Sequence, residues 1–143
     1  MIKAIALDDE KIALEVIQKH AEKIPYLELT YAFVNPFEAM DYLANHKADL
    51  IFLDINMPDI SGLDFLKALN TKPKVIFTTA YSEYAVDSYE YEAIDYLLKP
   101  FDFSRFLKAV NKAAEVLKEK NEEYLFLKEG FDHVRVALKE LIY

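Results

Sequence analysis

The 143 residues match one ordinary domain, and 53% of them are hydrophobic, which is enough for a buried core. Acidic residues outnumber basic ones by 25 to 17, so the net charge of −8 disfavours binding to nucleic acids and anionic membranes, whose phosphates this surface would repel. The absence of cysteine excludes disulfides and thiolate metal sites, and no apolar run reaches the length of a membrane span. We therefore expect a soluble, cytoplasmic protein whose partners are proteins or cations.

Short apolar runs alternate along the chain with segments of helical spacing. The apolar runs predict five β-strands, at Lys3–Leu7, Leu27–Phe33, Leu50–Leu53, Val75–Thr78 and Ile94–Leu98. Helices are predicted at Ile12–Lys23, from Pro36, from Gly62, at Ser82–Tyr91 and at Phe103–Lys120. Five strand-helix repeats joined by right-handed crossovers predict an α/β fold with a doubly wound parallel sheet and helices on both faces.

Two of the predicted helices begin with capping signals. Asn35 precedes Pro36, which suits the first position of a helix, and Glu38 completes the pattern of a capping box. Ser61 before Gly62 is a weaker version of the same signal. These residues predict helix starts near Pro36 and Gly62.

Polar residues stand at the carboxyl ends of four predicted strands. They are Asp8 and Asp9, Asp54, Thr79 and Lys99. Because the carboxyl ends of parallel strands meet at one edge of a sheet, we expect these side chains to converge. Three carboxylates at close range repel one another, and a hard divalent cation with oxygen ligands, for which Mg²⁺ is the best candidate, relieves this repulsion at pH 7.

The position of Asp54 predicts a chemical role. A carboxylate between a metal ion and the Lys99 ammonium is a nucleophile that can form an aspartyl phosphate. The cation and Lys99 would neutralise the oxygens of the transferred group, and the Thr79 hydroxyl would donate a hydrogen bond to one of them.

These residues resemble a known family. The pair Asp8-Asp9, the strand-end Asp54 followed by MPD and SG, the TTA at 78–80 and the pair Lys99-Pro100 are similar to the receiver domain of two-component response regulators. The resemblance covers residues 1–120 and implies a flavodoxin-like sheet with strand order 2-1-3-4-5. It also implies that Asp54 is the phosphoacceptor.

The resemblance further implies roles for the residues around the phosphoacceptor. Asp9 and Asp54, with the Asn56 backbone carbonyl, would bind Mg²⁺, and Asp8 would act mainly through water. Thr79 and Lys99 would hold the phosphoryl group, Tyr96 would be an aromatic switch, and the Lys99–Pro100 bond would be cis.

A signalling function follows from the resemblance. The domain would accept a phosphoryl group from a sensor histidine kinase and regulate transcription as a switch, and it would not be an enzyme beyond its own phosphorylation and dephosphorylation. Phosphorylation would change the face formed by the helix at 82–91, the strand at 94–98 and the helix at 103–120, through which a homodimer could form.

The C-terminal residues carry a second resemblance. Tyr124–Leu127 and Val134–Ala137 flank Gly130 and predict a β-hairpin. The stretch YLFLKEGFDHVRVALKELIY resembles the opening strands of a LytTR-type DNA-binding domain. Residues 121–143 would then be a linker and the first strands of an incomplete domain, and DNA would be bound only through the missing remainder.

Other protein classes fit the sequence less well. An enzyme of the haloacid dehalogenase type also uses an aspartate nucleophile on a parallel sheet, with the motif DxDx[TV], but in this chain Asn56 stands where the second acid is needed. A flavodoxin-like FMN binder needs a glycine- or hydroxyl-rich loop after the first strand, where this chain has DDEK. A group of tyrosines fits a packed core and a partner-facing patch equally well: Tyr81, Tyr84, Tyr89, Tyr91 and Tyr96.

Overall fold

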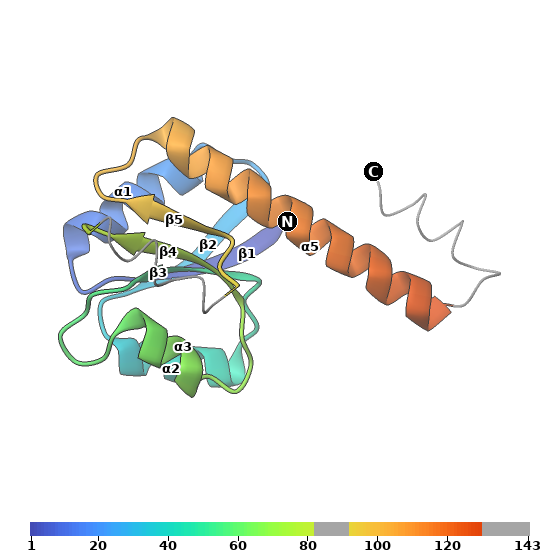
Figure 1. Cartoon of the computed structure of the whole chain (residues 1–143), viewed down its shortest axis with the longest axis horizontal. Coiled ribbons are helices and arrows are strands. Elements are labelled where there is room, and N and C mark those ends of the chain that lie inside the picture. The colour runs from blue at the N-terminus through green and yellow to red at the C-terminus, as the bar shows by residue number, and fades with distance from the viewer. Residues whose placement is uncertain (82–91, 130–143) are drawn as a thin grey trace.

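A computed structural model of the chain describes residues 1–81 and 92–129, with side chains up to Lys118 (Figure 1). In chain order, its elements are β1 (Ile2–Leu7), α1 (Lys11–Glu22), β2 (Leu27–Phe33), α2 (Pro36–Asn45), β3 (Leu50–Asp54), α3 (Gly62–Ala68), β4 (Lys74–Thr79), β5 (Asp95–Leu98) and α5 (Phe103–Glu129). The helix predicted at Ser82–Tyr91, the turn at Gly130 and the strand at Val134–Ala137 lie outside the described residues.

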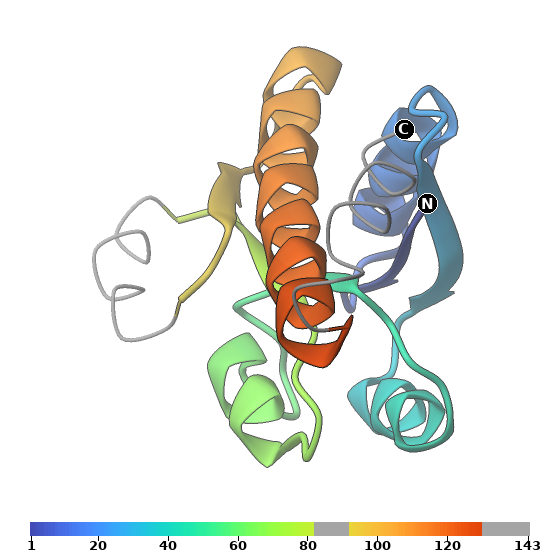
Figure 2. The same cartoon turned by 90° about the vertical axis from the view of Figure 1, so that its right-hand side faces the viewer.

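The predicted strands form one parallel sheet. Its strand order is β2-β1-β3-β4-β5, which confirms the doubly wound, flavodoxin-like topology. Among the described helices, α1 and α5 cover one face, and α2 and α3 cover the other (Figures 1 and 2). The strand order reverses at β1, because β2 lies on one side of it and β3 on the other. Folds of this kind bind ligands outside the carboxyl ends of the strands at such a point.

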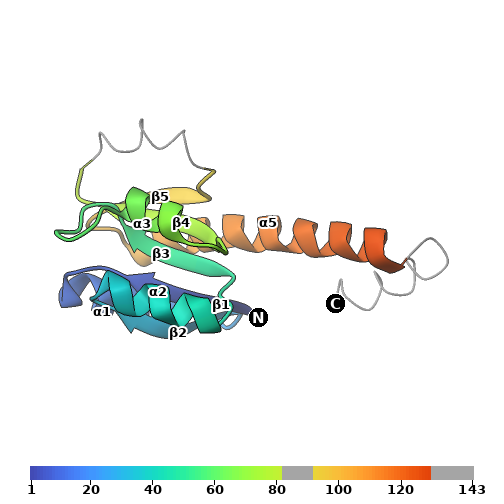
Figure 3. The same cartoon turned by 90° about the horizontal axis from the view of Figure 1, so that it is seen from below.

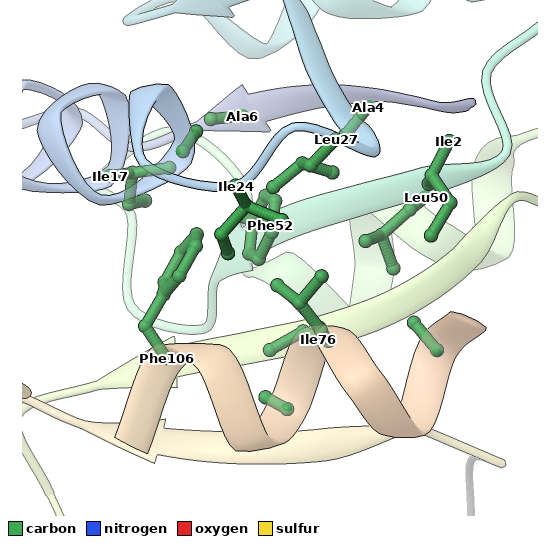
Figure 4. Close-up of a cluster of buried hydrophobic side chains, with 14 of the residues drawn as sticks. Ile2, Ala4, Ala6, Ile17, Ile24, Leu27, Leu50, Phe52, Ile76 and Phe106 are labelled. Carbon is green, nitrogen blue, oxygen red and sulfur yellow. The ribbon is translucent and has the colours of Figure 1, made fainter. Parts of the chain in front are cut away.

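Apolar cores fill the space on both faces of the sheet. The core under α1 and α5 contains Ile17, Phe52 and Phe106 (Figure 4), and the core under α2 and α3 contains Phe65. Because helices cover both faces, every residue of β3 is buried, including Asp54 at its end. The continuous apolar run of this strand therefore reflects burial on both sides.

The two predicted capping signals are confirmed. The Asn35 Oδ1 atom accepts hydrogen bonds from the N–H groups of Phe37 at 2.8 Å and Glu38 at 3.4 Å. The Ser61 Oγ atom accepts a hydrogen bond from the Asp64 N–H at 3.1 Å. Each side chain satisfies N–H groups that have no partner inside the helix.

The C-terminal helix is longer than predicted. α5 continues to Glu129, past the predicted end at Lys120, and it extends beyond the sheet (Figures 1 and 3). The strand predicted at Tyr124–Leu127 is therefore wrong, and so is a β extension beginning there, because these residues are helical. No glycine or proline interrupts the sequence from Phe103 to Glu129, so the helix meets no residue that would stop it.

The start of α3 lies against the end of β3. The Gly62 N–H donates a hydrogen bond to the Ile55 carbonyl at 2.8 Å. A Cβ atom at position 62 would lie 2.4 Å from the main-chain oxygen of Asp54. Only glycine allows the two segments to approach this closely.

We expect Gly62→Ala to lower the free energy of unfolding by about 1–3 kcal/mol, because the added methyl group would displace the main chain at Asp54. The control is Ala68→Ser, which adds an atom at an exposed position of the same helix and should change stability by less than about 0.5 kcal/mol. Urea denaturation followed by circular dichroism measures both values. Wild-type stability in Gly62→Ala would contradict the close contact.

Candidate functional site

Three of the polar residues at the strand ends converge as predicted. The Lys99 Nζ atom lies 2.7 Å from Asp8 Oδ2 and 3.6 Å from Asp54 Oδ1. Asp8 follows β1, Asp54 ends β3 and Lys99 follows β5, so three strands bring these groups together. The ammonium pairs more closely with Asp8 than with the predicted phosphoacceptor.

Both carboxylates are almost completely buried. The Asp8 side chain is 0% exposed and that of Asp54 is 3% exposed. Asp8 Oδ1 accepts a hydrogen bond from the Glu10 N–H at 2.9 Å, and Asp54 Oδ1 accepts one from the Asn56 N–H at 3.3 Å. The main chain after each strand therefore helps to hold its carboxylate.

Burial changes the acid-base properties of Asp54 and Lys99. Burial, and after it the charge of Asp8, raises the pKa of Asp54 from 3.8 to about 7, although Lys99 and the Asn56 N–H act in the opposite direction. Burial lowers the pKa of Lys99, but the hydrogen bond and charge of Asp8 and the charge of Asp54 together raise it above the ordinary value. Lys99 is therefore a cation at neutral pH, whereas ionisation of Asp54 costs free energy in the folded protein.

The acidic residues after β1 fit a hard cation. Oxygen atoms of Asp8, Asp9 and Glu10 lie within 4.8 Å of one another, and the carboxylates of Asp9 and Glu10 are exposed. Carboxylate oxygens are the ligands that Mg²⁺ prefers, so this donor set agrees with the predicted metal site. Glu10 was not predicted as part of it, although its position directly after the acidic pair was a usable signal.

A cavity of about 330 Å³ opens at this edge of the sheet. Its lining residues are Glu10, Asp54, Asn56, Met57, Pro58, Ala80, Tyr81 and Lys99. The carboxylate of Asp54 and the ammonium of Lys99 thus face the same space. A larger cavity of about 660 Å³ lies between α1 and β2, and none of the predicted site residues lines it.

The Thr79 hydroxyl lies at the same edge but contacts a loop. Its Oγ1 atom accepts a hydrogen bond from the Tyr81 N–H at 3.0 Å and lies 3.4 Å from the Tyr81 carbonyl oxygen. The Thr79 carbonyl accepts a hydrogen bond from the Lys99 N–H at 2.7 Å. Thr79 is therefore linked to Lys99 through the main chain.

Tyr96 of β5 is half-buried. Its ring stacks on Phe77 with centroids 5.4 Å apart and an interplanar angle of 16°. Tyr81 is 49% exposed and lines the cavity. Of these two tyrosines, Tyr96 therefore packs against the core and Tyr81 lies at the surface. The tyrosines at 84, 89 and 91 lie outside the described residues. The Lys99–Pro100 peptide bond is cis, as predicted.

The sequence and the fold match known proteins. The family model of the response regulator receiver domain matches residues 4–111. A response regulatory protein of Yersinia pestis is 35% identical over 136 residues, which are 94% of this chain and 57% of that protein. The sensory transduction protein LytR of Staphylococcus saprophyticus is 36% identical over 126 residues, 86% of this chain and 50% of its own length. The chain thus spans about half the length of the curated relatives it matches.

Solved structures agree with these matches. The response regulatory domain of MrkE from Klebsiella pneumoniae has a TM-score of 0.74 and 30% identity, covering 82% of this chain and 99% of that one. TrrA from Thermotoga maritima, solved in complex with Mg²⁺ and BeF, has a TM-score of 0.68 and 31% identity, covering 79% of this chain and 99% of that one. Within residues 1–81 and 92–129, no helix combines the length and hydrophobicity that a bilayer span requires. The chain belongs to the family of response regulator receiver domains of two-component systems.

Proposed function

We propose that Asp54 accepts a phosphoryl group from a sensor histidine kinase. The observation that carries the proposal is a buried carboxylate that faces a cavity of about 330 Å³, with the Lys99 ammonium 3.6 Å away. An oxygen of Asp54 would form a bond to phosphorus while the bond from phosphorus to the imidazole nitrogen of the donor breaks, and the imidazole would take a proton from solvent. Lys99 would neutralise part of the charge on the phosphoryl oxygens.

We also propose that Mg²⁺ binds beside Asp54. Asp9 and Asp54 would hold it with the Asn56 carbonyl, and Asp8 would act mainly through water. Glu10 offers a further oxygen within 4.8 Å of those of Asp8 and Asp9. Bound Mg²⁺ would supply positive charge against crowded carboxylates and phosphoryl oxygens. The related TrrA was solved with Mg²⁺ and BeF, which supports this proposal.

The proposed response to phosphorylation involves Thr79 and Tyr96. The Thr79 hydroxyl would leave Tyr81 to donate to a phosphoryl oxygen, and Tyr96 would move with it. A charge-assisted hydrogen bond supplies about 1.5–3 kcal/mol, whereas a nearly complete shift between two states needs about 5 kcal/mol. Lys99 and the cation would supply the difference.

The chain would act as the input half of a longer regulator. The match covers 57% of the Yersinia pestis relative and 50% of LytR, which is named a sensory transduction protein. We propose a cytoplasmic transcription regulator in which a LytTR-type domain after this chain binds DNA, and in which a homodimer forms through the face of β5 and α5. The receiver would be a switch that catalyses only its own phosphorylation and dephosphorylation.

Acetyl phosphate with Mg²⁺ should add one phosphoryl group to the intact protein, and Asp54→Asn should accept none. Intact-protein mass spectrometry measures this, because one phosphoryl group adds about 80 Da. Asp59→Asn is the control, since it removes an exposed carboxylate from the same loop and should be phosphorylated as the wild type is. Phosphorylation of Asp54→Asn to the wild-type level would reject Asp54 as the acceptor.

Asp54→Asn should also stabilise the metal-free protein at pH 8. The folded state raises the pKa of Asp54 from 3.8 to about 7, so its ionisation reduces stability as the pH rises through this window. With a chelator present, we expect a gain of about 1–3 kcal/mol at pH 8 that shrinks toward zero near pH 4. Urea unfolding at several pH values measures the gain. An Asp54→Asn protein less stable than wild type at pH 8 would refute the crowding of these carboxylates.

Asp9→Ala should weaken Mg²⁺ binding by at least about tenfold while the fold persists, because an exposed oxygen ligand is lost. The chain has no tryptophan, so isothermal titration calorimetry is the suitable measurement. Asp41→Ala removes an exposed carboxylate from α2 and should leave the affinity unchanged. Equal affinities in the two variants would exclude Asp9 as a ligand.

A further inference from the structure

The first turn of α5 is connected to β5 through Arg105. The Arg105 Nη1 and Nη2 atoms donate hydrogen bonds to Oδ2 and Oδ1 of Asp95, both at 2.8 Å. The Nη2 atom also donates to the main-chain carbonyl of Tyr96 at 3.0 Å. A planar guanidinium can make all of these contacts at once, which an ammonium group cannot.

These contacts hold the main chain of Tyr96 on both sides of its Cα atom. The Tyr96 N–H donates to Asp95 Oδ1 at 2.8 Å, and the Tyr96 carbonyl accepts from Arg105. The Asp95 carboxylate is thus shared between the guanidinium of α5 and the amide of Tyr96. A shift of Tyr96 along or across β5 would change both hydrogen bonds.

Side-chain alternation along β5 places Tyr96 and its neighbours on opposite faces of the sheet. The Tyr96 ring packs with the core on the α3 side and stacks on Phe77. Leu97 is buried in the core on the α5 side, in the same cluster as Phe106. The ring of Tyr96 therefore belongs to one core, while its main chain is bonded to the helix that covers the other.

The ion pair persists at neutral pH. The Asp95 side chain is only 10% exposed, and burial would raise its pKa, but the hydrogen bonds from Arg105 and the Tyr96 N–H outweigh burial and hold the pKa below its ordinary value. Lys112 of α5 also lies 3.2 Å from Asp95 Oδ2, with a side chain that is 48% exposed. Arg105 and Lys112 thus share one carboxylate, but in the described contacts Arg105 alone of the two reaches the Tyr96 carbonyl.

We propose that Arg105 is a positioning residue that couples the main chain of Tyr96 to α5, so that a change at Tyr96 reaches the helix leading out of the domain. The inference rests on the proposed function, in which phosphorylation of Asp54 moves Tyr96. α5 runs to Glu129 and beyond the sheet, so it is suited to carry the change to a following domain (Figure 3).

The test compares Arg105→Gln, Arg105→Lys and Lys112→Gln by hydrogen exchange and mass spectrometry of the whole chain. In the resting protein, the Tyr96 amide should exchange at least roughly tenfold faster in Arg105→Gln than in the wild type. Without the guanidinium, the Asp95 carboxylate is no longer held in the position where it accepts a hydrogen bond from this amide. Arg105→Lys should behave in the same way, since a lysine keeps the positive charge but cannot form the two parallel hydrogen bonds of the guanidinium. Lys112→Gln should match the wild type.

The second readout uses acetyl phosphate and Mg²⁺. We expect each variant to be phosphorylated on Asp54 to the wild-type level, while the phosphorylation-dependent change in exchange over residues 103–117 is lost in both Arg105 variants and kept in Lys112→Gln. Rescue by Arg105→Lys would overturn the proposal, because a charge contact alone would then suffice. Loss of the response in Lys112→Gln, or a wild-type response in Arg105→Gln, would overturn it too.

Failure of the proposed function would be recognised separately. A wild-type protein that accepts no phosphoryl group on Asp54 rejects the function, and the resting exchange of Tyr96 still decides the role of Arg105. Unchanged exchange of this amide in Arg105→Gln overturns the coupling. If Arg105→Gln does not fold, Arg105→Lys gives the same decision, since its charge preserves the ion pair with Asp95.

Discussion

Two buried carboxylates, those of Asp8 and Asp54, share the one ammonium group of Lys99 at the carboxyl edge of the sheet. The proposed chemistry of the domain depends on this excess of negative over positive charge. Lys99 pairs with Asp8 at 2.7 Å, so Asp54 at 3.6 Å receives only part of its charge, and burial raises the pKa of Asp54 to about 7. Paired tightly with Lys99, Asp54 would be stable and a poor nucleophile. Because Lys99 is already paired with Asp8, the Asp54 carboxylate is stabilised by any added positive charge, and this is the condition that the proposed binding of a cation and a phosphoryl donor requires.

The sheet makes this unfavourable arrangement possible because it is rigid and covered on both faces. β3 is buried along its whole length, and Gly62 lets α3 approach the main chain of Asp54 too closely for any side chain. The packing of both cores therefore offsets the cost of holding the carboxylates together. The loop contacts of Thr79 are different, since among the described residues its hydroxyl bonds to the main chain of Tyr81 and can exchange that partner at small cost in free energy.

The sequence predicted those parts of the site that depend on strand ends. Apolar runs that stop at Asp8, Asp54 and Lys99 define the edge of a parallel sheet, and topology alone then brings the residues together. The strand prediction at Tyr124–Leu127 was wrong, because a short apolar segment suits a strand as well as a helix. Only the structure, in which α5 continues through these residues, distinguishes the two. The pair of Asp95 and Arg105 was invisible, because it joins a strand to a helix across a loop and follows no local pattern.

In the proposed function, a signal from Asp54 to α5 has to cross the sheet, because the cavity beside Asp54 and the stacked ring of Tyr96 lie apart from the core that α5 covers. Close-packed strands leave side chains no path from one face to the other, so the main chain of a strand is the available route. β5 is the suitable strand, since it ends the described sheet and has β4 on one side. Its neighbour β4 is paired on both sides, with β3 and β5, whereas β5 can shift against one strand, and Arg105 bonds to it where such a shift would occur.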